Sequence, residues 1–225
     1  MHLYNSVPFC IDDVDKLKSS INKSVDTSNF NDAVIRVSEI KEAILKLKLN
    51  KRDGIVGLHS DHFVNAGDDL HVHLAMLLTG CFVHDYVPDE LWVSSIIQIP
   101  KGNNSYLSDS NNYRGISFNS IVCKIIDLIL ISRYSDLLCT SDLQFGFKSK
   151  MSTSMCTSLI KEVISYYTSN CSSVYCTLLD ATKAFDRVNY CKLFKLLIDR
   201  QLPPLILGFL LQMYTGSKAC IFWNG

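Results

Sequence analysis

The 225-residue sequence predicts an α+β fold, and three observations lead to that class. Hydrophobic residues make up 48% and charged residues 20% of the chain, which is the composition of a globular protein with a sizeable core. Apolar positions recur at helical spacing in some segments and form short β-type runs in others. Because the two kinds of segment do not alternate regularly, the sequence favours α+β over a succession of βαβ units.

The N-terminal region contains a polar segment followed by two predicted helices. Residues 1–35 are predicted to be a linker or the tail of an upstream region, because serine, threonine and asparagine are frequent there. The first firm helix is expected to begin near Ser38, a suitable N-cap, and its apolar residues follow at helical spacing: Ile40, Ala43, Ile44 and Leu47. After a glycine-containing loop at 50–57, residues 70–83 are predicted to form a second, mostly apolar helix.

The middle of the chain predicts a hairpin and then two helices. Residues 92–99 and 113–118 have extended patterns and flank the polar stretch 102–112, which indicates two paired strands around a mobile tip. Helices are expected over 121–138 and 154–167, with a short aromatic turn between them.

The C-terminal part predicts two strands separated by two helices. A buried strand is expected over 174–179, ending on Asp180. An amphipathic helix over 190–199, a final helix over 205–214 and the beginning of another strand over 219–223 complete the pattern.

Charge excludes some functions and leaves others open. Lysine plus arginine and aspartate plus glutamate each number 22, so the formal net charge is zero. A histone-like basic protein and a polyanion mimic are therefore excluded. Composition gives no support for nucleic-acid binding, although a local basic groove is compatible with a neutral chain.

Cysteine usage and the chain's first residues predict an intracellular protein. The nine cysteines include no Cys-x-x-Cys pair and no zinc-ligand spacing. No signal-peptide pattern is visible at the N-terminus, so we expect a location in the nucleus or cytoplasm, no secretion, and free thiols that pack as small hydrophobes. No apolar run of about 20 residues predicts a membrane span. No oligomeric state is predicted.

Three segments carry residues suited to phosphoryl-transfer chemistry, and each has a plainer alternative. Asp180 ends a predicted buried run, where a hard cation can reach it, and Phe185 could line the same pocket. Alternatively, Asp180 caps a turn and Phe185 belongs to the core. Lys101 and Arg114 flank the polar tip and could close on a triphosphate, or they are two solvated surface cations. Gln144–Phe147 is either a nucleobase-stacking platform or an ordinary packed turn.

The order of these segments is more specific than any one of them. They are Ile99-Pro100-Lys101, Asn112-Tyr113-Arg114-Gly115-Ile116-Ser117, Gln144-Phe145-Gly146-Phe147 with Ser152-Thr153, and Leu179-Asp180-Ala181-Thr182-Lys183-Ala184-Phe185-Asp186-Arg187-Val188. From about Ser38 to its end, the chain resembles the reverse transcriptases of non-LTR (LINE-type) retrotransposons.

The resemblance implies a right-hand polymerase, with fingers over 36–170 and the incomplete start of a palm over 171–225. The sequence departs from the family pattern at Gly115, where the family often has proline, and at 53–57, where both prolines and the second acidic residue are missing from the family's loop. The sequence also ends before the positions of the family's Gln-Gly motif and aromatic-Ala-Asp-Asp hairpin, so the resemblance implies a right-hand polymerase truncated before the second catalytic motif.

The same resemblance implies a set of site residues. Asp180 would be a catalytic ligand of Mg²⁺. Lys101 and Arg114 would hold the β- and γ-phosphates of the incoming nucleotide. The backbone near Lys183 and Ala184 would approach the triphosphate, and Phe185 would exclude a 2′-hydroxyl. The residues implied to lie near the template are Gln144, Phe145, Gly146, Phe147, Ser152 and Thr153. An RNA template, a DNA primer and dNTPs are the implied partners.

We therefore expect an RNA-directed DNA polymerase domain that is inactive by itself, because one aspartate holds Mg²⁺ weakly. Two alternatives stay open: a non-catalytic nucleic-acid-binding remnant, and a pseudogene product without function. An unpaired apolar edge at 174–179 further predicts an isolated chain of marginal stability.

Overall fold

The computed structural model describes residues 11–25, 29–53, 57–102, 108–109, 112–181, 184–185 and 187–222. The chain splits into two compact units, Met1–Leu137 with Asp186–Gly225 and Leu138–Phe185, and each is described by itself. Lys183, which the resemblance places near a triphosphate, lies outside the described residues.

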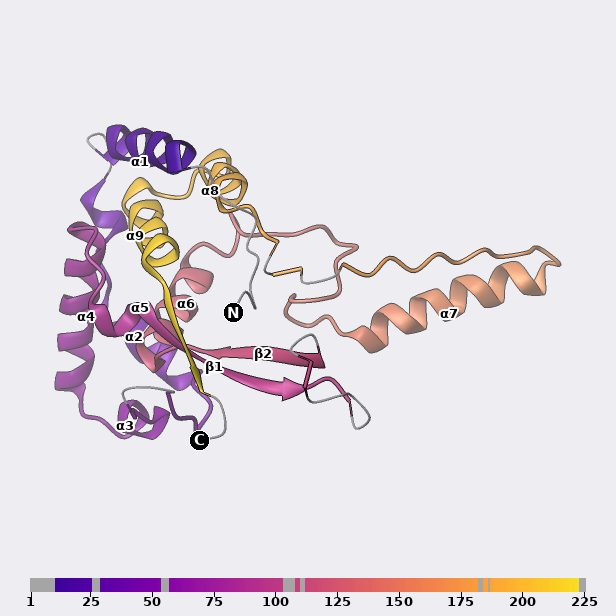
Figure 1. The fold of residues 1–225 in the computed structure, drawn as a ribbon, viewed down its shortest axis with the longest axis horizontal. Helices are drawn as coiled ribbons and strands as arrows, with labels where there is room; N and C mark the ends of the chain where they lie inside the picture. The colour runs from indigo at the N-terminus through magenta and orange to yellow at the C-terminus, as the bar shows by residue number, and fades with distance from the viewer. Residues whose placement is uncertain are drawn as a thin grey trace. The chain divides into compact units, whose positions relative to one another are not determined.

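The first unit is built mainly of helices (Figure 1). Their bounds are α1 Ile11–Val25, the 3-10 helix η1 Phe30–Asp32, α2 Val37–Leu45, α3 Ser60–Val64, α4 Asp68–Val83, α5 Asp89–Trp92, α6 Ile121–Arg133, α8 Tyr190–Asp199 and α9 Pro204–Gly216. Among the described residues, no helix is both long enough and apolar enough to cross a membrane.

The core of the first unit forms where apolar helix faces meet. Helix α2 packs on α4 and α6, while α9 packs on α4, α8 and α1. Phe82 of α4 meets Phe209 of α9 with ring centroids 4.6 Å apart. The fully buried apolar side chains of these helices are Ile40, Leu78, Phe82, Ile125, Ile129, Phe194, Ile206 and Phe209. Helix α9 is buried on most of its surface, which agrees with its continuous run of apolar residues.

Helix α1 occupies a segment for which the sequence predicts a linker or tail. Val14 and Ile21 are buried, and the helix packs on α9 and α8. The apolar positions Val14, Leu17 and Ile21 do have helical spacing, but aspartates, lysines and serines surround them. The helix becomes favourable when this narrow apolar stripe is covered by its neighbours.

Helix α2 begins one residue before its predicted cap. Arg36 is the N-cap residue, so Ser38 lies inside the first turn. The backbone N–H of Arg36 donates to Glu39 Oε2 at 2.8 Å, which is the reciprocal half of a capping box. Glu39 therefore caps this end of the helix by accepting from the N-cap backbone N–H, whereas Ser38 as N-cap would accept from an N–H one turn further along.

The sheet has three strands in the order β2-β1-β3. Strands β1 (Val93–Pro100) and β2 (Tyr113–Phe118) pair antiparallel, with Ile97 opposite Ile116, which confirms the predicted hairpin-like pair. Strand β3 (Lys218–Phe222) confirms the last predicted strand within its described residues and pairs parallel with β1. The resulting mixture of helices with a small sheet agrees with the α+β class.

The predicted buried strand at 174–179 is wrong. These residues have no regular secondary structure, and the side chains of Tyr175, Leu178 and Leu179 are 94%, 91% and 94% exposed. A β-strand satisfies its backbone N–H and C=O groups through a neighbouring strand, and no described strand pairs with this segment. The apolar run is therefore solvent-facing in the second unit.

The second unit contains one described helix, α7, over Thr153–Ser169 (Figure 1). None of its residues is buried. The described cysteines of both units are free thiols. Cys81 and Cys123 are buried as expected, whereas Cys176 is exposed because its predicted strand does not form.

Candidate functional site

The β1–β2 pair (Figure 1) has a distal end, where the polar tip joins the two strands; Lys101 directly follows β1 there and Arg114 is the second residue of β2. Ile99 faces Arg114 in the register, and the backbone N–H of Lys101 donates to the Asn112 carbonyl oxygen at 2.8 Å. Since Arg114 follows Asn112 by two residues, Lys101 and Arg114 are diagonal neighbours, on the order of 7–8 Å apart, with their Cβ atoms somewhat closer. The pairing of β1 with β2 thus places Lys101 and Arg114, the two cations predicted from the sequence to bind phosphate, near one another.

Burial along β1 explains why these cations reach solvent. Ser95 and Ile96 are buried, whereas Ile97 and Ile99 are each 45% exposed. Strand β1 is therefore buried at its proximal end and becomes exposed toward Lys101, while β2 is exposed along most of its length; Lys101 and Arg114 are both exposed residues. A lysine ammonium beside an arginine fork suits an oligophosphate anion.

Gly115 does not interrupt β2. It lies opposite Gln98 within the regular antiparallel register. Because Lys101 and Asn112 form a hydrogen-bonded pair and β2 is an edge strand, the Gly115 N–H points away from β1, so neither glycine nor proline at this position interrupts the ladder between β1 and β2. The presentation of Arg114 is preserved.

The aromatic turn at 144–147 lies in the second unit and is braced by its own polar groups. The Gln144 side-chain amide donates to the Gly146 carbonyl at 2.9 Å, and the Gln144 backbone N–H donates to the Ser141 carbonyl at 3.0 Å. Phe145 is half-buried, whereas Phe147 is 95% exposed. The Phe147 ring is therefore not buried within its own turn.

Ser152 and Thr153 begin helix α7. Ser152 is the N-cap residue, and its Oγ accepts a hydrogen bond from the Met155 N–H at 3.3 Å. The carbonyl of Thr153 accepts from Thr157 Oγ1 at 3.1 Å. Helix capping is a structural role that sequence reasoning did not assign to Ser152.

Asp180 is exposed at the end of the extended segment rather than at the end of a buried strand. Its carboxylate oxygens are the donor type that Mg²⁺ prefers. Within the described part of the chain, however, no group of three or more His, Cys, Asp or Glu side chains could hold a metal ion. The described residues therefore provide one carboxylate and do not fit a complete magnesium site.

Phe185 contacts Phe147 within the second unit. The ring centroids are 6.0 Å apart and the planes are nearly perpendicular, at 89°. Phe185 is 75% exposed, so the alternative that places it in the core is wrong. Ala184 is exposed in the adjoining turn. The predicted template turn and the predicted sugar-contacting residue are thus brought together.

Two separate groups of site residues result. Lys101 and Arg114 belong to the first unit, and the aromatic pair with Asp180 belongs to the second.

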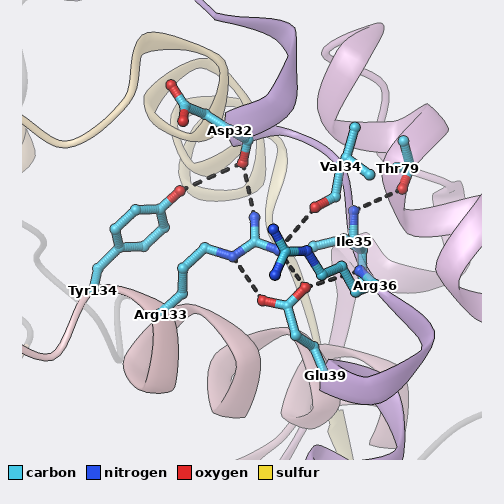
Figure 2. A network of polar contacts seen from close by, with 8 residues as sticks. All are labelled: Asp32, Val34, Ile35, Arg36, Glu39, Thr79, Arg133 and Tyr134. Carbon is cyan, nitrogen blue, oxygen red and sulfur yellow. Dashed lines mark hydrogen bonds and ion pairs between the residues drawn. The ribbon is translucent and has the colours of Figure 1, made fainter.

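Sequence reasoning missed a polar network centred on Arg133, the last residue of α6 (Figure 2). Its Nε donates to Glu39 Oε1 at 2.8 Å, and its Nη2 donates to Glu39 Oε2. Nη1 and Nη2 also donate to the carbonyl oxygens of Asp32 and Val34, each at 2.8 Å. The guanidinium thereby links α6 to α2 and to the segment that leads into it.

Burial and charge act in opposite directions on the Glu39 carboxyl. Burial raises its pKa, but the hydrogen bonds from Arg133 and the Arg36 N–H, with the charges of both arginines, outweigh that effect and hold the pKa below its ordinary value. A charged arginine ending an apolar helix is the signal in the sequence that could have suggested a buried partner. The identity of the partner depends on the fold.

Comparison with known proteins gives the family. Residues 99–225, more than half of the chain, match the family described as "Reverse transcriptase (RNA-dependent DNA polymerase)". A relative described as a 115 kDa protein in the type-1 retrotransposable element R1DM of Drosophila melanogaster is 23% identical over 188 residues, which cover 83% of this chain and 18% of the relative.

A second relative is described as an RNA-directed DNA polymerase from transposon BS of Drosophila melanogaster. It is 28% identical over 161 residues, which cover 68% of this chain and 17% of the relative. The chain thus spans less than a fifth of the length of either relative. The matched region contains the β1–β2 cations, the aromatic turn and Asp180 in the order that the sequence analysis recognised, and the chain belongs to the reverse transcriptase (RNA-dependent DNA polymerase) family as a LINE-type domain.

Proposed function

We propose that this chain provides the fingers and the beginning of the palm of an RNA-directed DNA polymerase, and that Lys101 and Arg114 bind the triphosphate of the incoming nucleotide. The observation that carries the proposal is the β1–β2 register, which makes the two exposed cations diagonal neighbours. Family membership supplies the reaction class, which is nucleotidyl transfer to a primer.

In that reaction the primer 3′-oxygen bonds to the α-phosphorus, and the bond from this phosphorus to the bridging oxygen breaks to release pyrophosphate. Negative charge grows on the departing β- and γ-phosphates. Lys101 and Arg114 would neutralise this charge, the first as a point charge and the second through paired N–H donors. Their proposed contribution is therefore to binding and to leaving-group stabilisation.

The second unit would contact the template and the sugar. We assign the template to the exposed turn at 144–147 with Ser152 and Thr153, and the sugar of the incoming nucleotide to Phe185. The backbone near Ala184, with the neighbouring Lys183, would approach the phosphates. The exposure of Phe147 and Phe185 supports contacts with nucleobases and sugars. An RNA template, a DNA primer and dNTPs are the proposed partners.

Asp180 would supply one carboxylate to the divalent metal ion of such a polymerase, for which we propose Mg²⁺. The described residues contain no further group of ligands for it. The role assigned to Asp180 is therefore that of a single donor.

Equilibrium binding of fluorescently labelled dTTP to the purified chain tests the proposal. Replacing both cations, Lys101→Ala with Arg114→Ala, is expected to weaken binding at least about tenfold, because two charge-assisted contacts are lost. Raising the salt concentration should weaken binding by the wild type more than by the double variant. Lys192→Ala is the matched control, since Lys192 is an exposed lysine of the same unit on α8.

Equal dTTP affinity in the wild type and the double variant would contradict the assignment. Salt-dependent binding of RNA without binding of dTTP would favour the alternative of a non-catalytic nucleic-acid-binding remnant.

A further inference from the structure

The second unit places two highly exposed phenylalanines in contact. Phe147 and Phe185 come from segments far apart in the sequence, and their rings meet edge to face, with centroids 6.0 Å apart and an interplanar angle of 89°. Phe147 is 95% exposed and Phe185 is 75% exposed. Neither ring is therefore held by a surrounding core, and the contact itself restricts their orientation.

Phe147 is fixed by the turn that carries it. Its φ angle is +58°, in the left-handed region that bulky residues rarely adopt. The turn is braced by the amide of Gln144 on the Gly146 carbonyl and by the ammonium of Lys148 on Asp142 Oδ1, at 2.9 and 3.1 Å. A disfavoured backbone conformation held by surrounding hydrogen bonds indicates that the direction of this side chain is specified.

Within the described part of the chain, no hydrogen bond braces Phe185 as the turn at 144–147 is braced. Phe185 follows an extended segment, 173–181, that forms neither helix nor strand, and it lies in a turn. Phe147, which is held by its turn, is therefore expected to constrain the orientation of the Phe185 ring.

We infer that Phe147 is a positioning residue for Phe185, because its ring edge sets the plane in which the Phe185 ring stands. This inference rests on the proposed function, in which Phe185 meets the sugar of the incoming nucleotide. Phe147 would then affect the choice between a 2′-hydrogen and a 2′-hydroxyl without touching the sugar itself. Phe147 would also link the turn at 144–147, which is proposed to contact the template, to Phe185, which is proposed to contact the nucleotide.

The contact requires an aromatic edge and not merely apolar bulk, because edge-to-face packing depends on the ring quadrupole. Tyrosine at position 147 should preserve it. Leucine should remove it while keeping an apolar side chain, and glycine should remove the ring while suiting the positive φ angle.

Fluorine NMR of the full chain labelled with 4-fluorophenylalanine tests the positioning role. The Phe185 resonance is identified by its loss in Phe185→Leu. It is expected to shift in Phe147→Leu and in Phe147→Gly, and to remain near its wild-type position in Phe147→Tyr. Phe118→Leu is the control, since Phe118 is an exposed phenylalanine of β2 in the other unit. Unchanged resonances elsewhere show that the variants remain folded.

A Phe185 resonance that is the same in wild type, Phe147→Leu and Phe147→Gly would overturn the inference. So would a shift in Phe147→Tyr as large as that in Phe147→Leu, because bulk or backbone changes would then explain both.

Titration of the same samples with dATP and ATP separates this inference from the proposed function. The wild type is expected to bind dATP more tightly than ATP, and Phe147→Leu should reduce that ratio about two- to tenfold. If neither nucleotide perturbs Phe185 in the wild type, the proposed function fails, while the comparison of resonances still decides the positioning role. An unchanged ratio despite a shifted resonance would overturn the effect on sugar selection.

Discussion

Arg133 joins parts of the first unit that are distant in the sequence. Its guanidinium donates to the Glu39 carboxylate and to the carbonyl oxygens of Asp32 and Val34 (Figure 2). The nearby backbone N–H of Ile35 donates to Thr79 Oγ1 at 2.9 Å, which ties the same segment to α4. The segment before α2 thus has its backbone groups satisfied by side chains from two other helices.

Replacing this arginine should destabilise the protein. Arg133→Ala is expected to lower the free energy of unfolding at pH 7 by about 2–4 kcal/mol, because Glu39 loses its partner and two carbonyl groups lose donors. Urea denaturation measures the change. Lys46→Ala is the control, since Lys46 is exposed near the same network and should change stability by less than about 0.5 kcal/mol.

The effect of this substitution should depend on pH. The pKa of Glu39 is lowered in the folded protein from an ordinary value of 4.5. Its ion pair therefore contributes fully above that value, and the contribution is lost as the pH falls through the lowered pKa. The stability difference between wild type and Arg133→Ala should narrow below about pH 4.5. A difference that stays constant down to pH 3 would show that the carboxylate contributes nothing.

At the scale of elements, α1 departs furthest from the sequence prediction, because a packed helix lies where a linker or tail was expected. Ile21 is 2% exposed, and the helix packs on α8 and α9. Ile21→Ala is expected to lower the free energy of unfolding by about 2–4 kcal/mol through lost burial and a residual cavity. Thermal unfolding with calorimetry measures the change.

Lys16→Ala provides the comparison within the same helix, because Lys16 is exposed. It should leave stability almost unchanged. Equal, negligible effects of both substitutions would mean that the segment behaves as the linker that composition suggests.

Strand β1 is the element on which the candidate triphosphate site depends. It pairs with β2 from Ser95 to Pro100 and with β3 from Val93 to Ile97, so its distal end is paired on one side only and its side chains there are more exposed. The segment at 174–179 has equally apolar residues but no described partner. Only the first segment forms a strand, because it has neighbouring strands to pair with; β-propensity does not distinguish the two segments.

At the scale of the whole molecule, the described residues contain one side chain that we predict to bind the metal ion, the carboxylate of Asp180. We expect no primer extension by the purified chain with Mg²⁺, an RNA template, a DNA primer and four dNTPs, because one carboxylate cannot hold the metal ions that nucleotidyl transfer requires. Gel electrophoresis of the labelled primer measures extension. The dTTP-binding assay on the same sample shows whether the protein is competent to bind nucleotide.

Extension that Asp180→Asn abolishes would contradict this prediction. It would show that the chain carries a working metal site around Asp180.

Several features could be predicted from the sequence because they depend on near neighbours. Helical spacing located α4, α6, α7, α8 and α9, and the polar tip between two extended runs located the β1–β2 pair. The order of short motifs indicated the family, since residue types and their spacing persist in the sequence whatever their surroundings. The cations Lys101 and Arg114 were found in the same way.

Other features were decided by the tertiary structure, because each depends on a partner distant in the chain. No local signal specifies the partner in the parallel pairing of β3 with β1, in the docking of α1 or in the bonds of Arg133 to Glu39. The same reason explains the failure at 174–179, where an apolar run suggested burial but no described strand covers it. Sequence by itself determined which residues are suited to polymerase chemistry. The fold decided that Lys101 lies beside Arg114 and that Phe147 meets Phe185, because long-range packing and backbone pairing select these neighbours.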